Sequence, residues 1–333
     1  MYDLLGISII LAALLLLNAA AALLTALLWK AMAALVNSFS AHIRSDLLFT
    51  LRMSAPAVAV LAVFLFVIPS YLGYEPNAPP EVVSKKLAAL ALLSLASIAF
   101  AIWRTIRSWR ATAALCKQWL SKSHQIQVPG IKVPAFRIPH HFPIVAIIGT
   151  LRPKLFIADS VLSSLSQDEL AAAIAHECGH LAAHDNLKRM LLRVSRDSLL
   201  LVPFGRRVER MWAESAESAA DEFAARQSAA TALNLASALV TIAKMVPEGA
   251  RADVPLGAYL VGAEETQGVK SRIRRLIDMA SSNSLKSRRS SLSHLIPVAS
   301  LISFAVIAAI LASNPQILLG VHTVLEFAVN LLC

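Results

Sequence analysis

An uninterrupted apolar run near the N-terminus limits what this chain can fold into more than any other feature of the sequence. The run extends from Leu4 to Leu28 without a charged residue and is followed by Trp29 and Lys30. Its 25 residues exceed the roughly 20 that a helix needs to cross a bilayer. A cleaved signal peptide would have a basic start and a shorter apolar core, whereas this chain begins Met-Tyr-Asp. We therefore predict a retained membrane anchor.

Further apolar segments predict a polytopic membrane protein. The chain is 57% hydrophobic and 16% charged, with a mean hydropathy of +0.63, which is typical of membrane proteins. The predicted spans are residues 4–28, 55–72, 87–103 and 295–312, with a polar loop at 30–54. The hydrophobic tail, residues 314–333, fits a fifth span or an amphipathic helix at the outer surface, because Glu326 is costly in lipid.

Basic residues are concentrated between the third and fourth predicted spans. Residues 104–290 contain 26 Lys/Arg and 16 Asp/Glu, whereas the rest of the chain contains five of each sign. Because positively charged segments stay in the cytoplasm, we predict a cytoplasmic domain at 104–290, an N-terminus outside and a location in the inner (plasma) membrane. The densest cluster, VKSRIRRLIDMASSNSLKSRR, has no aromatic residue. It therefore favours lipid headgroups over nucleic acid as a partner.

The predicted domain begins with short strands and continues with helices. Between residues 126 and 160, Val, Ile and Phe are interrupted by Pro and Gly, and IVAIIGTLRPKLFIA predicts a hairpin with its turn near Gly149–Pro153. Ser166 and Glu169 then form a capping box that starts a helix. The expected fold class is mainly α, with a small β-hairpin or sheet in the cytoplasmic domain.

This helix carries AHECGH, residues 175–180, a pattern typical of a zinc site. His176 and His180 lie one turn apart on one face, so both imidazoles can bind one Zn²⁺. Glu177 lies beside them, where it can accept a proton from a water molecule. The alternative is a pair of partly buried histidines with an exposed glutamate. Uncharged neighbours of the motif fit a buried metal site, and we predict one catalytic Zn²⁺ with Glu177 as general base.

A second helix is expected to supply the third ligand that a catalytic zinc needs. AESAESAADEFAA places Glu217 and Asp221 one turn apart. Glu217 is the predicted ligand, and Asp221 is predicted to accept a hydrogen bond from a ligand imidazole. Glu214 is the rival ligand, one turn earlier. The acidic residues of this helix also fit a merely solvated face.

Together these segments resemble the BlaR/MecR-type integral-membrane zinc metallopeptidases over about residues 1–313. IIGTLRPKLFI resembles the strand pair that precedes the zinc helix in this family, and HECGHLAAHD resembles the family's H-E-x-x-H motif followed by an aspartate. ESAAD resembles the family's E-x-x-x-D element, and VKSRIRRLID resembles its basic segment before the last span. The resemblance implies a zincin-like domain of the gluzincin type, with Asp185 supporting the site. The wider relatives are membrane-embedded CAAX-processing and stress peptidases, which share the H-E-x-x-H … E-x-x-x-D scheme.

The resemblance implies an endopeptidase that cuts cytoplasmic or membrane-proximal proteins, or itself, in signal-dependent proteolysis of a transcriptional regulator. A separate sensor or repressor protein is the implied partner. The family's antibiotic sensors carry a penicillin-binding domain after the fourth span, where this chain has about 20 residues, so we expect no β-lactam binding. Quality control of membrane proteins is the second hypothesis, and a catalytically silent adaptor is the third. The oligomeric state does not follow from the sequence.

Overall fold

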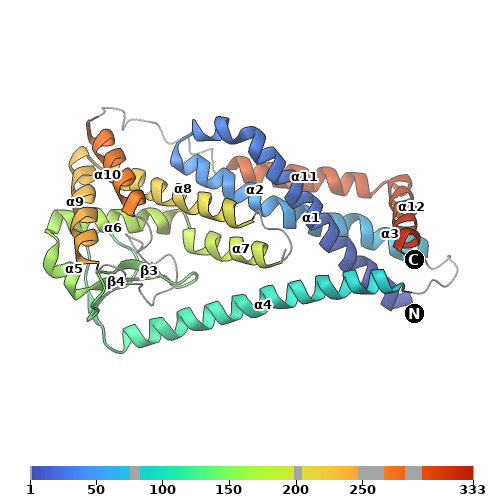
Figure 1. Ribbon diagram of the computed structural model, residues 1–333, viewed down its shortest axis with the longest axis horizontal. Coiled ribbons are helices and arrows are strands. Elements are labelled where there is room, and N and C mark those ends of the chain that lie inside the picture. The colour runs from blue at the N-terminus through green and yellow to red at the C-terminus, as the bar shows by residue number, and fades with distance from the viewer. Residues whose placement is uncertain (1, 76–82, 199–204, 247–265, 282–294, 333) are drawn as a thin grey trace.

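A helical end and a mixed α/β end lie along the length of an elongated molecule (Figure 1). The computed structural model describes residues 2–75, 83–198, 205–246, 266–281 and 295–332. The helical end contains α1 (Tyr2–Asn37), α2 (Ala41–Ala62), the π-helix η1 (Val63–Val67), α3 (Ile68–Tyr74), α11 (Leu295–Ala312) and α12 (Pro315–Leu332). Helix α4 (Lys85–Leu120) connects the two ends, and both chain termini lie far from the sheet.

Three helices in the described part of the chain are long and apolar enough to cross a membrane: α1, the continuous stretch from α2 to α3, and α4. Helices α11 and α12 qualify only as a pair, and this pair is bent by 89°. The tail, for which the sequence allowed a fifth span or a surface helix, is thus a separate helix. It packs on α3, where the Ser70 hydroxyl donates to the Leu318 carbonyl at 2.9 Å.

The stretch predicted as a polar loop, residues 30–54, is mostly helical in the structure. Helices α1 and α2 are separated by three residues, and the polar side chains of α2 find partners in the α/β end. Lys188 pairs with Asp46 at 2.7 Å, and the Arg52 guanidinium donates to the Ser195 carbonyl at 3.1 Å. Because these polar groups are paired through tertiary contacts, the segment does not need to form a solvated loop.

Helix α4 also differs from the prediction, because it continues 17 residues past the predicted end of the 87–103 span. The extension begins with three arginines between residues 104 and 110, and arginine is a good helix former. Charge therefore ends the apolar stretch without ending the helix. The extension reaches the sheet, where the Trp119 and Phe156 rings meet edge to face with their centroids 5.2 Å apart.

A four-stranded sheet forms the base of the α/β end. Its strands are β1 (His124–Ile126), β2 (Ala135–Ile138), β3 (Val145–Ile148) and β4 (Lys154–Ala158), in the order β1-β2-β4-β3. Strands β2 and β4 are parallel, and the other pairs are antiparallel. The β3–β4 pair confirms the predicted hairpin, whose turn holds Gly149 at a φ of 106°. Strand β3 lies at an edge, so one side of it is not paired with another strand among the described residues.

Six further helices complete the α/β end: α5 (Asp159–Ser164), α6 (Gln167–Ala182), α7 (Asp185–Asp197), α8 (Gly205–Ala225), α9 (Ala229–Met245) and α10 (Thr266–Ser281). The capping box that starts α6 is confirmed, with the Ser166 and Glu169 side chains each accepting from the other residue's backbone N–H. The structure thus confirms the predicted fold class, a mainly helical chain with apolar helices of membrane length and a small sheet.

A separate apolar cluster joins the membrane-length helices to the α/β end. Leu48 of α2, Leu192 of α7 and Trp212 of α8 are almost completely buried against one another. Burial of side chains of this size contributes about 1.5–3 kcal/mol each. Helix α8 is therefore packed against α2.

Candidate metal centre

Helix α6 presents both histidines of its motif toward α8. His176 is completely buried, and His180 follows it by one turn. Gly179 permits a close approach of the two helices, because a Cβ at this position would lie 3.0 Å from the Ala220 Cα of α8. Side chains of α8 can therefore reach the two imidazoles directly.

The predicted third ligand meets the two histidines. Glu217 Oε2 lies 3.6 Å from His176 Nε2, Glu217 Oε1 lies 3.6 Å from His180 Nε2, and the two Nε2 atoms are 3.2 Å apart. These are the three residues in the described part of the chain whose ligand atoms gather closely enough to hold one ion. Ligands of a tetrahedral Zn²⁺ bound at 2.0–2.1 Å lie about 3.3 Å from one another. The spacing therefore fits a zinc ion.

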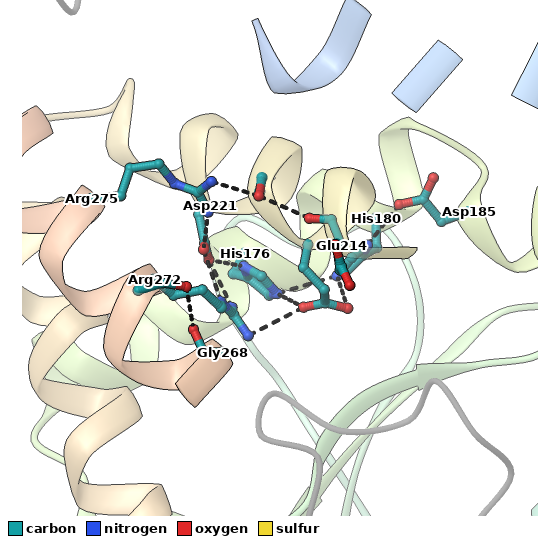
Figure 2. A network of polar contacts seen from close by, with 11 residues as sticks. His176, His180, Asp185, Glu214, Asp221, Gly268, Arg272 and Arg275 are labelled. Carbon is teal, nitrogen blue, oxygen red and sulfur yellow. Dashed lines mark hydrogen bonds and ion pairs between the residues drawn. The ribbon is translucent and has the colours of Figure 1, made fainter. Parts of the chain in front are cut away.

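Two buried carboxylates orient the imidazoles. His176 Nδ1 lies 3.0 Å from Asp221 Oδ1, and His180 Nδ1 lies 2.7 Å from Asp185 Oδ2 (Figure 2). Because each carboxylate accepts the Nδ1 hydrogen, each neutral imidazole presents a lone pair on Nε2. Two facing lone pairs cannot hydrogen-bond to each other, whereas a cation is stabilised by both. Carboxylates in this position are the usual companions of zinc-binding histidines.

The neighbours of Glu217 keep it ionised. Burial opposes its charge, but His180, His176 and Arg272 outweigh burial and hold the pKa of Glu217 well below its usual range. Burial also opposes a charge on His180, yet Glu217 and Asp185 raise the pKa of His180 to about 10. The carboxylates thus favour a positive charge at this position. A divalent cation competes with protons for such a site.

Glu177 lies beside the ligand group without joining it. Its side chain is buried, and its Oε2 accepts the Ile147 backbone N–H at 3.1 Å. Burial raises the pKa of Glu177, against the opposing effect of the nearby imidazoles of His180 and His176. A carboxyl group with a raised pKa beside a metal site is suited to accept a proton and release it again.

The first two residues of α7 connect the zinc helix to the sheet. Asp185 contacts His180, and the amide of Asn186 donates to the carbonyls of Ile147 and Gly149 at 3.0 and 3.1 Å. Ile147 directs its N–H to Glu177 and its carbonyl to Asn186, so both of its backbone groups face the unpaired side of β3. One dipeptide therefore sets the position of the motif relative to this strand edge. The sequence indicated Asp185 but not Asn186.

Arg272 of α10 is a second site residue that the sequence did not reveal. Its Nη2 and Nε donate to Asp221 at 2.7 and 2.9 Å, and its Nη1 lies 3.3 Å from Glu217 Oε2 (Figure 2). Burial opposes a charge on Asp221, but Arg272 and His176 outweigh it and lower the pKa of Asp221. VKSRIRRLID showed only a basic segment, and nothing local in it indicated a contact with a carboxylate 51 residues earlier.

Two residues near the motif stay outside the ligand group. The rival ligand Glu214 is exposed and does not belong to the group of potential ligands. His184 is exposed and caps α7 in the left-handed conformation, with a φ of 56°. This conformation turns the chain sharply after α6 and brings the following Asp185 back to His180.

An open cleft of about 2140 Å³ leads to the site. Its walls are formed by α4 from Arg104 to Leu120, by β3 and the turn that follows it, and by faces of α7, α8 and α10. Glu217, Arg272 and Asn186 line it, together with Ile147 of the edge strand. A polypeptide in the cleft would thus meet both the candidate ligand group and the unpaired side of β3.

The comparisons with known proteins agree with a peptidase. The model of peptidase family M48 matches residues 146–318, just over half of the chain. The matched region begins in β3 and includes α6, α7 and α8, which carry all the predicted site residues. The comparison with curated proteins gives no match.

Proposed function

Because this chain belongs to peptidase family M48, we propose that it is a membrane-anchored, zinc-dependent endopeptidase that cuts cytoplasmic or membrane-proximal polypeptides. One observation carries the proposal. The Nε2 atoms of His176 and His180 converge with the Glu217 carboxylate, while Glu177 lies beside this group in contact with an edge strand. Ligands, general base and a strand for substrate alignment are thereby adjacent.

The roles of the residues follow from their contacts. Zn²⁺ held by His176, His180 and Glu217 would supply Lewis acidity to the scissile carbonyl and acidify the attacking water. Glu177 would take the proton from this water and pass it to the leaving amine, because its carboxylate is not used as a ligand. Asp221 would hold the Nδ1 hydrogen of His176, so that Nε2 keeps its lone pair for the metal.

Strand addition is the proposed way in which a substrate is aligned. An extended peptide can pair with an exposed sheet edge through its backbone, independently of its sequence. The outward N–H and carbonyl of Ile147 occupy the part of this edge that faces the motif. Glu177 and Asn186 contact the same edge, so a bound strand would exchange the contacts of the Glu177 carboxylate and the Asn186 amide with this edge for its own.

The narrower resemblance to BlaR/MecR-type peptidases supports a proposed role in regulated proteolysis, with a transcriptional regulator as substrate and a separate sensor as partner. The quality-control hypothesis predicts a different substrate set. Mass spectrometry of new N-termini in cells with the wild type or with Glu177→Gln separates the two. A few cuts in one cytoplasmic regulator support signalling, and many cuts in misassembled membrane proteins contradict it.

Glu217→Ala should remove most of the bound zinc and of the peptidase activity, whereas Glu214→Ala should change neither. The two glutamates are one turn apart on α8, but Glu217 alone joins the two histidines. Zinc per chain, measured by mass spectrometry of the purified proteins, and cleavage of an unstructured peptide are the readouts. Zinc loss in Glu214→Ala with full zinc in Glu217→Ala would show that the other turn of α8 supplies the ligand.

We further propose that the α/β end lies in the cytoplasm, on the basis of its positive charge. In a background with Cys116, Cys178 and Cys333 replaced by serine, Gly73→Cys and Ser121→Cys place single thiols at exposed positions at opposite ends of the apolar helices. A membrane-impermeant thiol reagent should label Gly73→Cys in intact cells and Ser121→Cys only after lysis. The reverse pattern would place the α/β end outside.

A further inference from the structure

Cations dominate the cleft that leads to Glu217. Among the described residues, twelve Arg and Lys side chains line it against four Asp and Glu, a net charge of +8, while the whole chain carries +10. The positive-inside bias accounts for basic residues on this side of a membrane, but not for their gathering in one concave surface. A cleft with walls of one charge sign focuses the electric field and attracts ligands of the opposite sign.

Some of these cations already have partners inside the cleft. Arg104 pairs with Asp197 at 3.0 Å, and Arg196 pairs with Glu209 at 2.7 Å. Burial lowers the pKa of Arg193, and the neighbouring Arg189 lowers it further, with Arg196 and Arg104 acting in the same direction. Among the described residues that line the cleft, carboxylates are therefore fewer than cations.

Other cations in the cleft form no ion pair with any residue in the described ranges. They are Lys117 of α4, Arg152 and Lys154 at the turn of the β3–β4 hairpin, and Arg206 and Arg210 of α8. Their side chains come from three separate elements that surround one opening. An anionic ligand in the cleft would therefore meet positive charge on several sides.

One face of α8 connects the candidate metal centre to two of these cations. Arg206, Arg210 and Glu217 line the cleft and follow one another at helical spacing. At a rise of about 1.5 Å per residue, Arg210 lies about 10 Å and Arg206 about 16 Å along the helix from Glu217. An extended peptide advances about 3.3 Å per residue. These arginines thus lie level with positions about three and five residues from the scissile bond.

We propose that the cleft selects polypeptide segments with two acidic side chains, one about three residues from the cleaved bond, which Arg210 binds, and one about five residues from it, which Arg206 binds. The proposal rests on the proposed peptidase function and names its substrate class. Anionic lipid headgroups would be attracted by the same charges. The cleft, however, is also lined by Glu217 of the candidate ligand group and by Ile147 of the edge strand, which suit a peptide and not a headgroup. A polypeptide is therefore the favoured ligand.

Binding to the full-length Glu177→Gln protein, in nanodiscs of zwitterionic lipid, tests the proposal without turnover. The probes are fluorescent peptides of one length with Asp/Glu, Asn/Gln or Lys at the two positions, on either side of a common central sequence. We expect the acidic peptides to bind about two- to thirty-fold more tightly than the amide peptides, the combined effect of two exposed ion pairs. The difference should shrink as salt is raised.

The double variant Arg206→Glu/Arg210→Glu should abolish this preference, and Arg206→Lys/Arg210→Lys should retain it. Arg207→Glu is the matched control, because Arg207 is exposed on the same turn of α8 but does not line the cleft. Unchanged zinc content in each variant shows that the site is intact.

Equal binding of acidic and amide peptides would overturn the proposal. It would also be overturned if Arg207→Glu reduced the preference for acidic peptides as much as Arg206→Glu/Arg210→Glu does. It would also be overturned if vesicles containing anionic lipid bound through Arg206 and Arg210 while acidic peptides did not compete. Wild-type cleavage separates this failure from that of the proposed function. Cleavage without an acidic preference contradicts the substrate class alone, and acidic binding without any cleavage contradicts the peptidase function alone.

Discussion

Glu177→Gln is expected to leave zinc bound and the fold intact while slowing peptide hydrolysis by about 10²–10⁴-fold or more. The glutamine amide has the shape of the carboxylate, and its oxygen can still accept the Ile147 N–H that Glu177 Oε2 accepts at 3.1 Å. It cannot, however, take a proton from water. Because the same carboxylate would also deliver a proton to the leaving amine, its loss affects two proton transfers.

The measurement compares zinc content, thermal unfolding and cleavage of an unstructured peptide in wild type and Glu177→Gln. Glu214→Gln serves as the control, because it removes a carboxylate from the same cleft but not from the ligand group. Equal cleavage by wild type and Glu177→Gln would show that this residue is not the general base. Full zinc in both proteins with cleavage by neither would favour the adaptor hypothesis.

His176→Ala and His180→Ala should each reduce bound zinc from about one ion per chain to near zero and stop hydrolysis. Each change leaves two protein ligands, and a catalytic zinc needs three. Removing the His176 imidazole should not leave its partner Asp221 without a counter-charge, since Arg272 still contacts Asp221 at 2.7 Å. We therefore expect metal loss without global unfolding.

Zinc per chain after dialysis against a weak chelator measures this effect, and circular dichroism checks the fold. His184→Asn is the matched control: His184 follows His180 by one turn, is exposed, and has a left-handed backbone that asparagine tolerates. Full zinc occupancy in the double variant His176→Ala/His180→Ala would contradict the assignment of the site.

Features with local signals were predictable from the sequence. The β3–β4 hairpin has two short apolar runs around a Gly/Pro turn, and Ser166 with Glu169 marks the start of α6. The spacing of His176 and His180 placed both on one helix face. Each of these predictions depends on residues that are close together in the sequence, so no information about distant contacts was needed.

Features that depend on distant partners were not predictable. The polar part of α2 is helical because α7, about 140 residues later, pairs with its charged groups. The length of α4 was missed because charge marks the end of an apolar stretch and not the end of a helix. Arg272 was indicated only as part of a basic segment, since its contact with Asp221 arises from the packing of α10 near α8.

Hydrolysis in water enriched in oxygen-18 is the most direct test of a zinc peptidase. Purified full-length protein, in detergent or liposomes, would be stripped of metal, reloaded with zinc and incubated with unstructured peptides. We predict that the zinc-loaded wild type forms shorter peptides with oxygen-18 in the new carboxyl terminus, and that the stripped protein and zinc-loaded Glu177→Gln do not. The proposed chemistry would be contradicted if the zinc-loaded wild type left the peptides intact. It would also be contradicted if zinc-loaded Glu177→Gln formed as much labelled product as the wild type.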